Sequence, residues 1–228
     1  LFAISDEQAM WRVQMYDDNQ AFAQLLKRWE EPIQRLCTRM LGDEHKAQDM
    51  TQEAFSKVYA RRKDFQHGSK FSTFLWRVAV NLCLDELRRL KRRREVSVFH
   101  EPPDSEASET DFPGTDPLPD DEAVSDEDAR LVRWALARLP EHYRSVVILR
   151  HYEDLKFREI AEVLSIPEGT VKSRMAEALS TLHQILRKPL NDEPALWKPA
   201  ALRKSNRGPA PNQREALVQR AQRELLAL

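Results

Sequence analysis

The sequence predicts an all-α protein: two small helical domains joined by an acidic, flexible linker. Apolar residues recur at helical spacing through most of residues 5–94 and 129–188. Charged residues make up 32% of the 228 positions and glycine occurs only 5 times, a composition typical of helices rather than sheets. Residues 95–128 contain 13 acidic residues, five prolines and no Lys or Arg, so they cannot bury enough apolar surface to fold by themselves.

Residues 1–94 are expected to form a bundle of three or four antiparallel helices. Ser5, with Gln8 three residues later, is typical of a capping box at a helix start. An apolar stripe then continues past Pro32, and the Gly-Asp pair at 42–43 ends one helix and begins another. A polar break around Gly68 precedes a long helix that runs to the end of this domain.

Beyond the acidic linker, helical spacing returns in residues 129–188. Residues 189–228 form a Pro-rich C-terminal extension, whose last 15 residues have amphipathic spacing. Either these residues form a terminal helix that docks elsewhere or they are disordered. The acidic linker also leaves two interpretations open: its carboxylates either imitate nucleic acid or serve only as a solubilising tether.

A helix-turn-helix is predicted at residues 157–186. A short amphipathic helix ends at a turn in which Pro167 stops the first helix and Gly169 supplies an unusual backbone angle. Thr170 then caps a second helix. The positions near its exposed N-terminal end, which meet bases and phosphates in such motifs, are Lys172, Ser173, Arg174 and Glu177. The alternative is an ordinary helical hairpin with a solvated charged face.

Residues 61–94 interleave aromatic rings with cations, holding 11 Lys and Arg against 3 acidic residues. Aromatic faces stack on unpaired bases, and cations neutralise phosphates. The combination predicts a segment that holds a locally separated DNA strand. The alternative is that Phe71, Phe74 and Trp76 belong to the core and that the basic run is a solvated helix end.

Other classes of site find little support. Six scattered His and two Cys give no metal signature, so neither a metal nor a cofactor is expected. Cys37 and Cys83 lie in apolar helical patterns and are predicted to be buried thiols in a reducing cytoplasm. No apolar run is long enough to predict a membrane span, and the first residues are too short and acidic for a secretory signal.

Three segments resemble the extracytoplasmic-function (ECF) sigma factors of bacteria. They are DMTQEAFSKVY at 49–59, FSTFLWRVAVNLCLDELRR at 71–89 and LARLPEHYRSVVILRHYEDLKFREIAEVLSIPEGTVKSR at 136–174. The first two resemble region 2 of that family and the third resembles region 4. The resemblance implies a non-enzymatic subunit that directs bacterial core RNA polymerase to promoter DNA, opens the DNA and starts transcription. It also implies regulation by an anti-sigma factor, an expectation by analogy alone.

The resemblance also implies roles for individual residues. A polymerase contact is implied for Asp49, Gln52 and Glu53, which share one helix face. Contacts to the −10 element are implied for Phe65, His67, Lys70, Trp76, Asn81, Arg88 and Arg89. Contacts to the −35 element are implied for Thr170, Lys172, Ser173 and Arg174. Asp85 also matches a position of the family's −10-binding helix, but an acidic residue near DNA can instead serve only to orient an arginine.

One departure from the family pattern concerns the recognition helix. The family usually continues this helix with basic residues where the chain has Ala176 and Glu177. A carboxylate repels phosphate but accepts a hydrogen bond from the amino group of cytosine. We therefore predict weak or unusual −35 recognition.

Two rival functions remain at this stage. A dimeric helix-turn-helix regulator would bind duplex DNA tightly without polymerase and would ignore single strands, and the basic aromatic helix argues against it. An enzyme has almost no support, because the sequence contains no Gly-rich phosphate loop, nucleophile elbow or metal-binding set.

Overall fold

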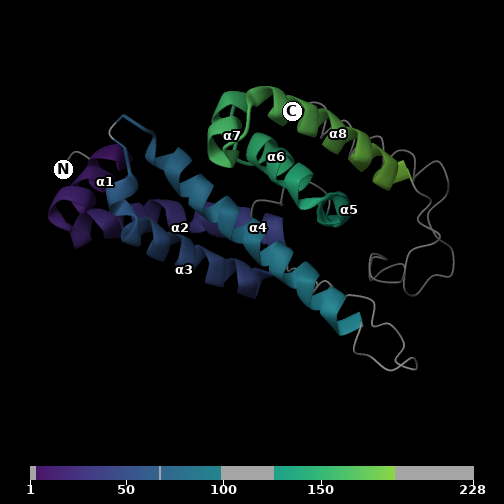
Figure 1. The fold of residues 1–228 in the computed structure, drawn as a ribbon, viewed down its shortest axis with the longest axis horizontal. Helices are drawn as coiled ribbons and strands as arrows, with labels where there is room; N and C mark the ends of the chain where they lie inside the picture. Colours follow the sequence, from purple (N-terminus) through teal and green to yellow (C-terminus); the bar gives the residue numbers. More distant parts are fainter. Residues whose placement is uncertain (1–3, 67, 99–125, 188–228) are drawn as a thin grey trace.

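The computed structural model describes residues 4–66, 68–98 and 126–187, and every regular element within them is helical (Figure 1). A first group of helices precedes the acidic segment and a second group follows it. The first group consists of α1 (Asp6–Tyr16), α2 (Asn19–Leu41), α3 (Glu44–Ala60), the short 3-10 helix η1 (Arg62–Asp64) and α4 (Phe71–Val98). The second consists of α5 (Asp126–Arg138), α6 (Glu141–His151), α7 (Phe157–Leu164) and α8 (Glu168–Arg187).

Local signals in the sequence set most helix boundaries of the first group. The predicted capping box at Ser5 is confirmed, with reciprocal 3.2 Å bonds between Ser5 and Gln8. Helix α2 passes Pro32 without a break. It ends at Gly42, whose φ of 69° suits a residue without a side chain, and the Asp43 carboxylate then caps α3.

Helix α2 is the central element of the first group, because α1, α3 and α4 all pack against it. Its buried face includes Leu25, Ile33 and Met40, none of which is exposed to solvent. Cys37 of α2 and Cys83 of α4 are also fully buried and form no disulfide, as predicted for core thiols. This apolar contact fixes the long helix α4 against the bundle.

The second group contains the helix-turn-helix, with one correction to its turn. The left-handed residue is Ser165, with φ of 55°, and it ends α7. Helix α8 begins at Glu168, so Gly169 and Thr170 lie in its first turn. The predictions that Gly169 supplies the unusual angle and that Thr170 caps the helix are therefore wrong. With Ser165 in that conformation, the N–H of Ile166 bonds back to the carbonyl of Ala161 at 3.1 Å, and this bond closes the end of α7.

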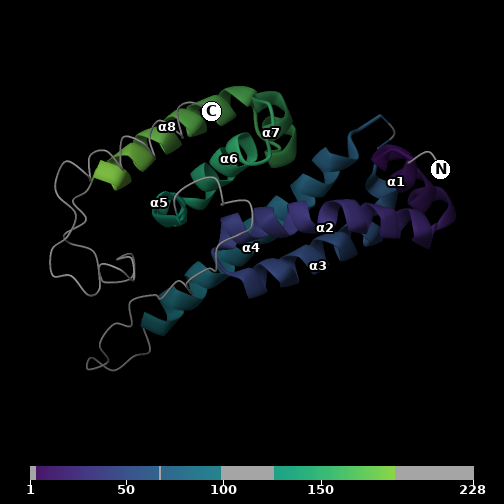
Figure 2. The ribbon, with the colours of Figure 1, turned by 180° about the vertical axis from the view of Figure 1, so that it is seen from behind.

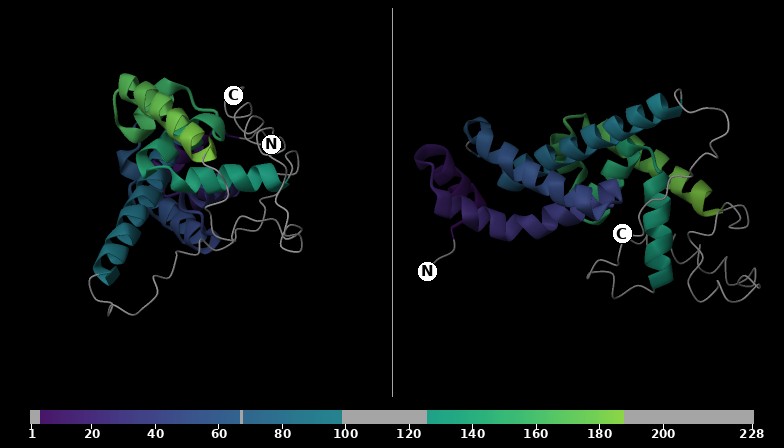
Figure 3. Two further views of the ribbon diagram at one scale, coloured as in Figure 1. Left: turned by 90° about the vertical axis from the view of Figure 1, so that its right-hand side faces the viewer. Right: turned by 90° about the horizontal axis from the view of Figure 1, so that it is seen from below.

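The two groups touch each other. Helix α7 packs against α4, and α6 packs against α2 (Figures 1 and 2). The C-terminal half of α4 extends beyond the rest of the helices (Figure 3). It runs to Val98, and α5 starts at Asp126, so both helices extend a few residues into the predicted linker. Residues 99–125 and the C-terminal extension lie outside the described residues.

No helix in the part of the chain that the structure describes is long and apolar enough to cross a membrane.

Candidate nucleic-acid interface

A cleft of about 1070 Å³ separates the loop before α4 from α7. One wall comes from α3, the loop at residues 64–70 and the first half of α4, and the opposite wall comes from α7. Four cations of the first wall line it: Lys57, Arg61, Lys70 and Arg77. Predicted −10 residues that line it are Phe65, Lys70 and Asn81. The structure therefore brings together a ring, a cation and an amide that are spread over 17 residues of sequence.

Helix α1 holds the loop in place from both ends. The Gln14 amide donates to the carbonyls of Lys63 and Phe65, at 3.1 Å each. The Glu7 carboxylate accepts the backbone N–H of Phe71 at 3.2 Å, where α4 begins. Backbone hydrogen bonds, those of Glu7 and Phe71, lower the pKa of Glu7 and keep it ionised for this contact. Between these anchors Gly68 has φ of 87°, a conformation that other residues rarely adopt.

The aromatic residues divide between the cleft and the core. Phe65 is 5% exposed and lies 5.8 Å from Phe74, centroid to centroid, at the base of the cleft. Trp76 is 4% exposed and faces away from the cleft, edge-on to Trp29 at 5.6 Å. The Trp29 indole in turn donates to Asp6 of α1. Trp76 thus belongs to the core, the alternative left open by the sequence, and we do not retain it as a DNA contact.

Farther along α4, the two arginines predicted to contact the −10 element each form an ion pair within the helix. Arg89 donates two bonds to Glu86, at 2.6 and 2.9 Å. Arg88 pairs with Asp85 at 3.1 Å, which fits the suggestion that this acid orients an arginine. Asn81 is exposed on the cleft side, so its amide is available to a base edge. His67 lies outside the described residues.

The predicted polymerase contacts form one exposed face of α3. Asp49 and Gln52 are exposed, and Glu53 is half-buried. Glu53 pairs with Lys57 one turn later, at 2.9 Å. This face is separate from the buried side of α3, where Ala54 packs in the core. The arrangement leaves two polar side chains free to meet a partner protein.

The predicted −35 residues lie along the exposed side of α8. Lys172 pairs with Glu168 at 2.7 Å, and the Ser173 hydroxyl donates to the carbonyl of Thr170 at 3.1 Å. Arg174 is half-buried. The opposite side of the helix is core, with Val171, Met175, Ala178 and Leu182 buried. Helix α8 therefore presents a polar edge while its apolar edge packs on α6 and α7.

Tyr143 fixes the carboxylate of Glu177, the residue that stands where the family usually has a basic one. The Tyr143 hydroxyl of α6 donates to Glu177. This hydrogen bond raises the pKa of Tyr143, because ionisation of the phenol would place two negative charges together. Glu177 therefore has a fixed direction at the exposed edge of α8.

Comparisons with known proteins agree with this geometry. The family model described as Sigma-70 region 2 matches residues 25–93, and the one described as Sigma-70, region 4 matches residues 129–182. The ECF RNA polymerase sigma factor SigW of Bacillus subtilis is 35% identical over 170 residues, which cover 75% of this chain and 91% of SigW. The chain belongs to the ECF sigma factors. It is thus an RNA polymerase sigma factor that directs promoter recognition and transcription initiation.

A second relative is also named as an RNA polymerase sigma factor. The RNA polymerase sigma-H factor of Pseudomonas aeruginosa is 34% identical, covering 79% of this chain and 93% of the relative. Among solved structures, the fold of this sigma factor resembles that of CnrH in complex with the cytosolic domain of CnrY. The TM-score is 0.57 at 20% identity, covering 79% of this chain and 96% of that one. The sigma factor RpoE bound to the anti-sigma factor NepR, from Bartonella quintana, gives a TM-score of 0.54 at 20% identity, covering 74% and 98%.

Sequence reasoning missed several residues of this sigma factor's cleft. Gln14 and Glu7 hold the loop, yet each stands in an ordinary helical pattern with no local sign of that role. The far wall is closed by the N-cap of α7, Lys156, and by three residues of α7 that were read only as part of the helix-turn-helix; these three are Arg158, Glu159 and Glu162. For Trp76 a signal was present, since it precedes the buried Val80 by four residues and so continues the apolar stripe of α4.

Among the residues that the structure describes, no cluster of His, Cys, Asp or Glu is arranged to hold a metal ion.

Proposed function

We propose that this sigma factor reads the opened −10 strand in the cleft beside α4 and grips the −35 duplex with α8. The cleft carries the proposal, because it combines cations for phosphates, rings at its base and the exposed amide of Asn81 for a base edge. The retained −10 set is Phe65, His67, Lys70, Asn81, Arg88 and Arg89.

The exposed face of α3 is proposed to dock on core RNA polymerase through Asp49, Gln52 and Glu53. Their placement on one side of a helix gives a partner a continuous polar surface. We assign the protein no catalytic role, and we propose that it acts in the cytoplasm, where it meets polymerase and promoter DNA.

At the −35 element, Thr170, Lys172, Ser173 and Arg174 are proposed to contact DNA, with Glu177 as an unusual neighbour. A carboxylate held by Tyr143 repels a phosphate but accepts a hydrogen bond from cytosine. We therefore propose weak −35 binding with a preference for cytosine opposite Glu177. Glu177→Arg should raise −35 affinity and change the preferred base, and unchanged affinity and preference would contradict this assignment.

Regulation by an anti-sigma factor is a further part of the proposal. Two proteins of similar fold were solved with a bound protein: CnrH with the cytosolic domain of CnrY, and RpoE with the anti-sigma factor NepR. The support is analogy of fold, which does not identify the partner of this chain.

Transcription in vitro with core polymerase tests the function directly. The wild-type chain should confer specific start sites on core enzyme, and mapping those sites gives the promoter sequence. Asn81→Ala should reduce discrimination at one −10 position about tenfold, since a base contact contributes roughly 1–3 kcal/mol. The control is Lys27→Ala, an exposed residue of α2 away from the cleft. Failure of the wild-type chain to select any start site would refute the proposal.

A further inference from the structure

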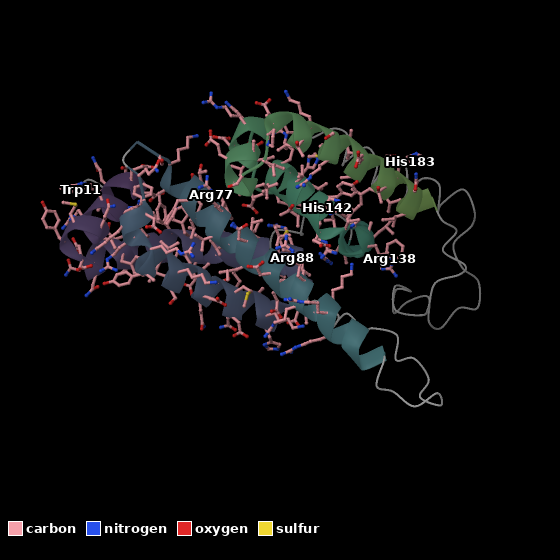
Figure 4. All side chains as sticks on the ribbon, viewed as in Figure 1. Trp11, Arg77, Arg88, Arg138, His142 and His183 are labelled. Carbon is pink, nitrogen blue, oxygen red and sulfur yellow. The ribbon has the colours of Figure 1, made fainter. Side chains whose placement is uncertain are left out.

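We propose that helix α1 sets the base selectivity of the −10 cleft by holding the loop at residues 64–70, with Glu7 and Gln14 as positioning residues. The inference rests on the proposed function, since it takes the cleft as the −10 site. Neither residue lines the cleft, so both act through the backbone that they hold. Figure 4 shows Trp11 of α1 on one side of the loop and Arg77 of α4, which lines the cleft, on the other.

Glu7 and Gln14 hold opposite ends of the loop from one face of α1. They are seven residues apart, so they share a face and are separated by two helical turns, about 10 Å along the axis. Glu7 accepts the backbone N–H of Phe71. Gln14 donates to the carbonyls of Lys63 and Phe65. The spacing of the two side chains along a helix therefore fixes the distance between the two ends of the loop.

Helix α1 is itself tied to its neighbours at both ends. Near its start, Asp6 accepts hydrogen bonds from Arg28 and, at 2.9 Å, from the Trp29 indole, both on α2. Just after its end, Asp17 accepts a hydrogen bond from Arg62 of η1 at 2.7 Å. A helix tied at both ends is a rigid support for the loop that it holds.

The amide of Gln14 is oriented by the two carbonyls to which it donates. Both of its N–H donors are used, and its Oε1 is buried without a hydrogen-bond partner among the described residues. Turning the amide over would place this oxygen against the carbonyls of Lys63 and Phe65, so one orientation is favoured. The position therefore requires a side chain with two donors.

Glu7 closes the other end of the loop, where α4 begins. Phe71 is the first residue of α4, so the Glu7 carboxylate meets the positive end of the helix dipole. The Phe71 ring is fully buried and lies 6.4 Å from the ring of Phe65, centroid to centroid. The backbone positions that Glu7 and Gln14 hold thus carry neighbouring rings beneath the cleft.

A loop held at both ends discriminates between bases because it does not adapt to the wrong one. A base that enters the cleft must fit the places that Phe65 and Lys70 already occupy, whereas a loose loop rearranges around several bases. A loose loop also loses more conformational entropy when it binds. Release of the loop should therefore lower discrimination and affinity at the −10 element and leave −35 binding unchanged.

Four variants of α1 separate the two contacts. Gln14→Met removes both donors and keeps an unbranched side chain of similar length. Glu7→Met removes the acceptor for the Phe71 N–H, whereas Glu7→Gln keeps an oxygen there. A double variant, Glu7→Met with Gln14→Met, releases both ends of the loop. The matched control is Gln34→Met, the same change at a half-buried glutamine of α2 that does not line the cleft.

The measurements use the full-length chain. Transcription by the holoenzyme measures discrimination, on a promoter found by mapping wild-type start sites and varied to each base in turn at every −10 position. Hydrogen exchange of peptides that cover residues 63–74 measures opening of the loop. Thermal melting and affinity for core polymerase in the absence of DNA report any general effect on the fold.

We expect Gln14→Met to reduce discrimination at the most selective −10 position about tenfold, as for the loss of one or two neutral hydrogen bonds. Glu7→Met should act in the same direction, Glu7→Gln should stay within about twofold of wild type, and the double variant should lose more than either single variant. Exchange in residues 63–74 should be faster in the double variant, while its melting temperature stays within about 3 °C of wild type. Gln34→Met should match wild type throughout.

Unchanged discrimination in the double variant would overturn the proposal. A loss of discrimination that comes with a lower melting temperature or weaker binding to core polymerase would also overturn it, because Glu7 and Gln14 would then only stabilise the fold. A wild-type holoenzyme that selects no start site refutes the proposed function and this inference with it. A holoenzyme that selects start sites while the double variant discriminates as wild type does refutes the role of α1 alone.

Discussion

A variant of Trp76 can show whether this residue contacts DNA or only stabilises the fold of the domain. Its family position predicts a −10 contact, whereas the structure buries it against Trp29, and Trp29 is bonded to Asp6 of α1. Removal of the ring in Trp76→Ala leaves a cavity where α1, α2 and α4 meet. Large-to-small changes of a buried Trp cost about 3–5 kcal/mol. For a chain of this size each kcal/mol lowers the melting temperature by roughly 2–4 °C, so a loss of about 10 °C is expected.

Circular dichroism during heating measures this loss, and promoter opening by the holoenzyme at 15 °C measures function. At that temperature Trp76→Ala should still open promoters within about threefold of wild type, because a domain with 5–15 kcal/mol of stability remains mostly folded. Asn81→Ala is the matched control, five residues later on the same helix but exposed. It should melt as wild type does and lose −10 discrimination. A Trp76→Ala protein with normal melting and defective promoter opening would refute the reasoning.

Two further predictions concern the contact between the helical groups. Arg144→Ala removes the hydrogen-bond donors to the carbonyls of Met40 and Leu139, and we expect the free energy of unfolding, measured with urea, to fall by about 3 kcal/mol. The control is Arg158→Ala, whose side chain is 83% exposed, and it should change the free energy of unfolding by less than about 0.5 kcal/mol. Equal effects of the two variants would contradict the role assigned to Arg144. Burial raises the pKa of Glu153 to about 7, and Arg39 opposes this shift only in part, so folding takes up a proton between the two pKa values. The stability that the protonated Glu153 carboxyl contributes is complete below pH 4.5 and is lost as the pH rises to about 7. Glu153→Gln should therefore be as stable as wild type at pH 5 and more stable by on the order of 2 kcal/mol at pH 8, as measured by urea unfolding at both pH values. An equal difference in stability at the two pH values would exclude titration of Glu153 as the cause.

Much of the fold and family was already contained in the order of residues along the chain. Helical periodicity, the capping box at Ser5 and the Gly-Asp pair at 42–43 act through neighbours within one or two turns, and the structure confirms each of them. The apolar stripe of α4 even contained the information that Trp76 is buried, four residues before Val80. Local signals of this kind are readable because the interactions behind them are local.

The turn of the helix-turn-helix was harder, although it is also local. The sequence pointed to Gly169 for the left-handed conformation because glycine adopts it at little cost. The structure places that conformation at Ser165, which turns the chain so that the N–H of Ile166 bonds back to the carbonyl of Ala161 in α7. A hydrogen bond at a helix end here outweighs the intrinsic preference of the residue.

Only the tertiary structure decided what surrounds the cleft. Lys70 meets Glu159 across 89 residues of sequence, Arg144 reaches Met40 across 104, and Tyr143 fixes Glu177 across 34. A sequence shows that each of these side chains is charged or polar, and periodicity shows which side of its helix it occupies. It does not show which helix lies opposite, because that depends on how the apolar faces of both groups pack together. The partners of the cations in the cleft follow from that packing.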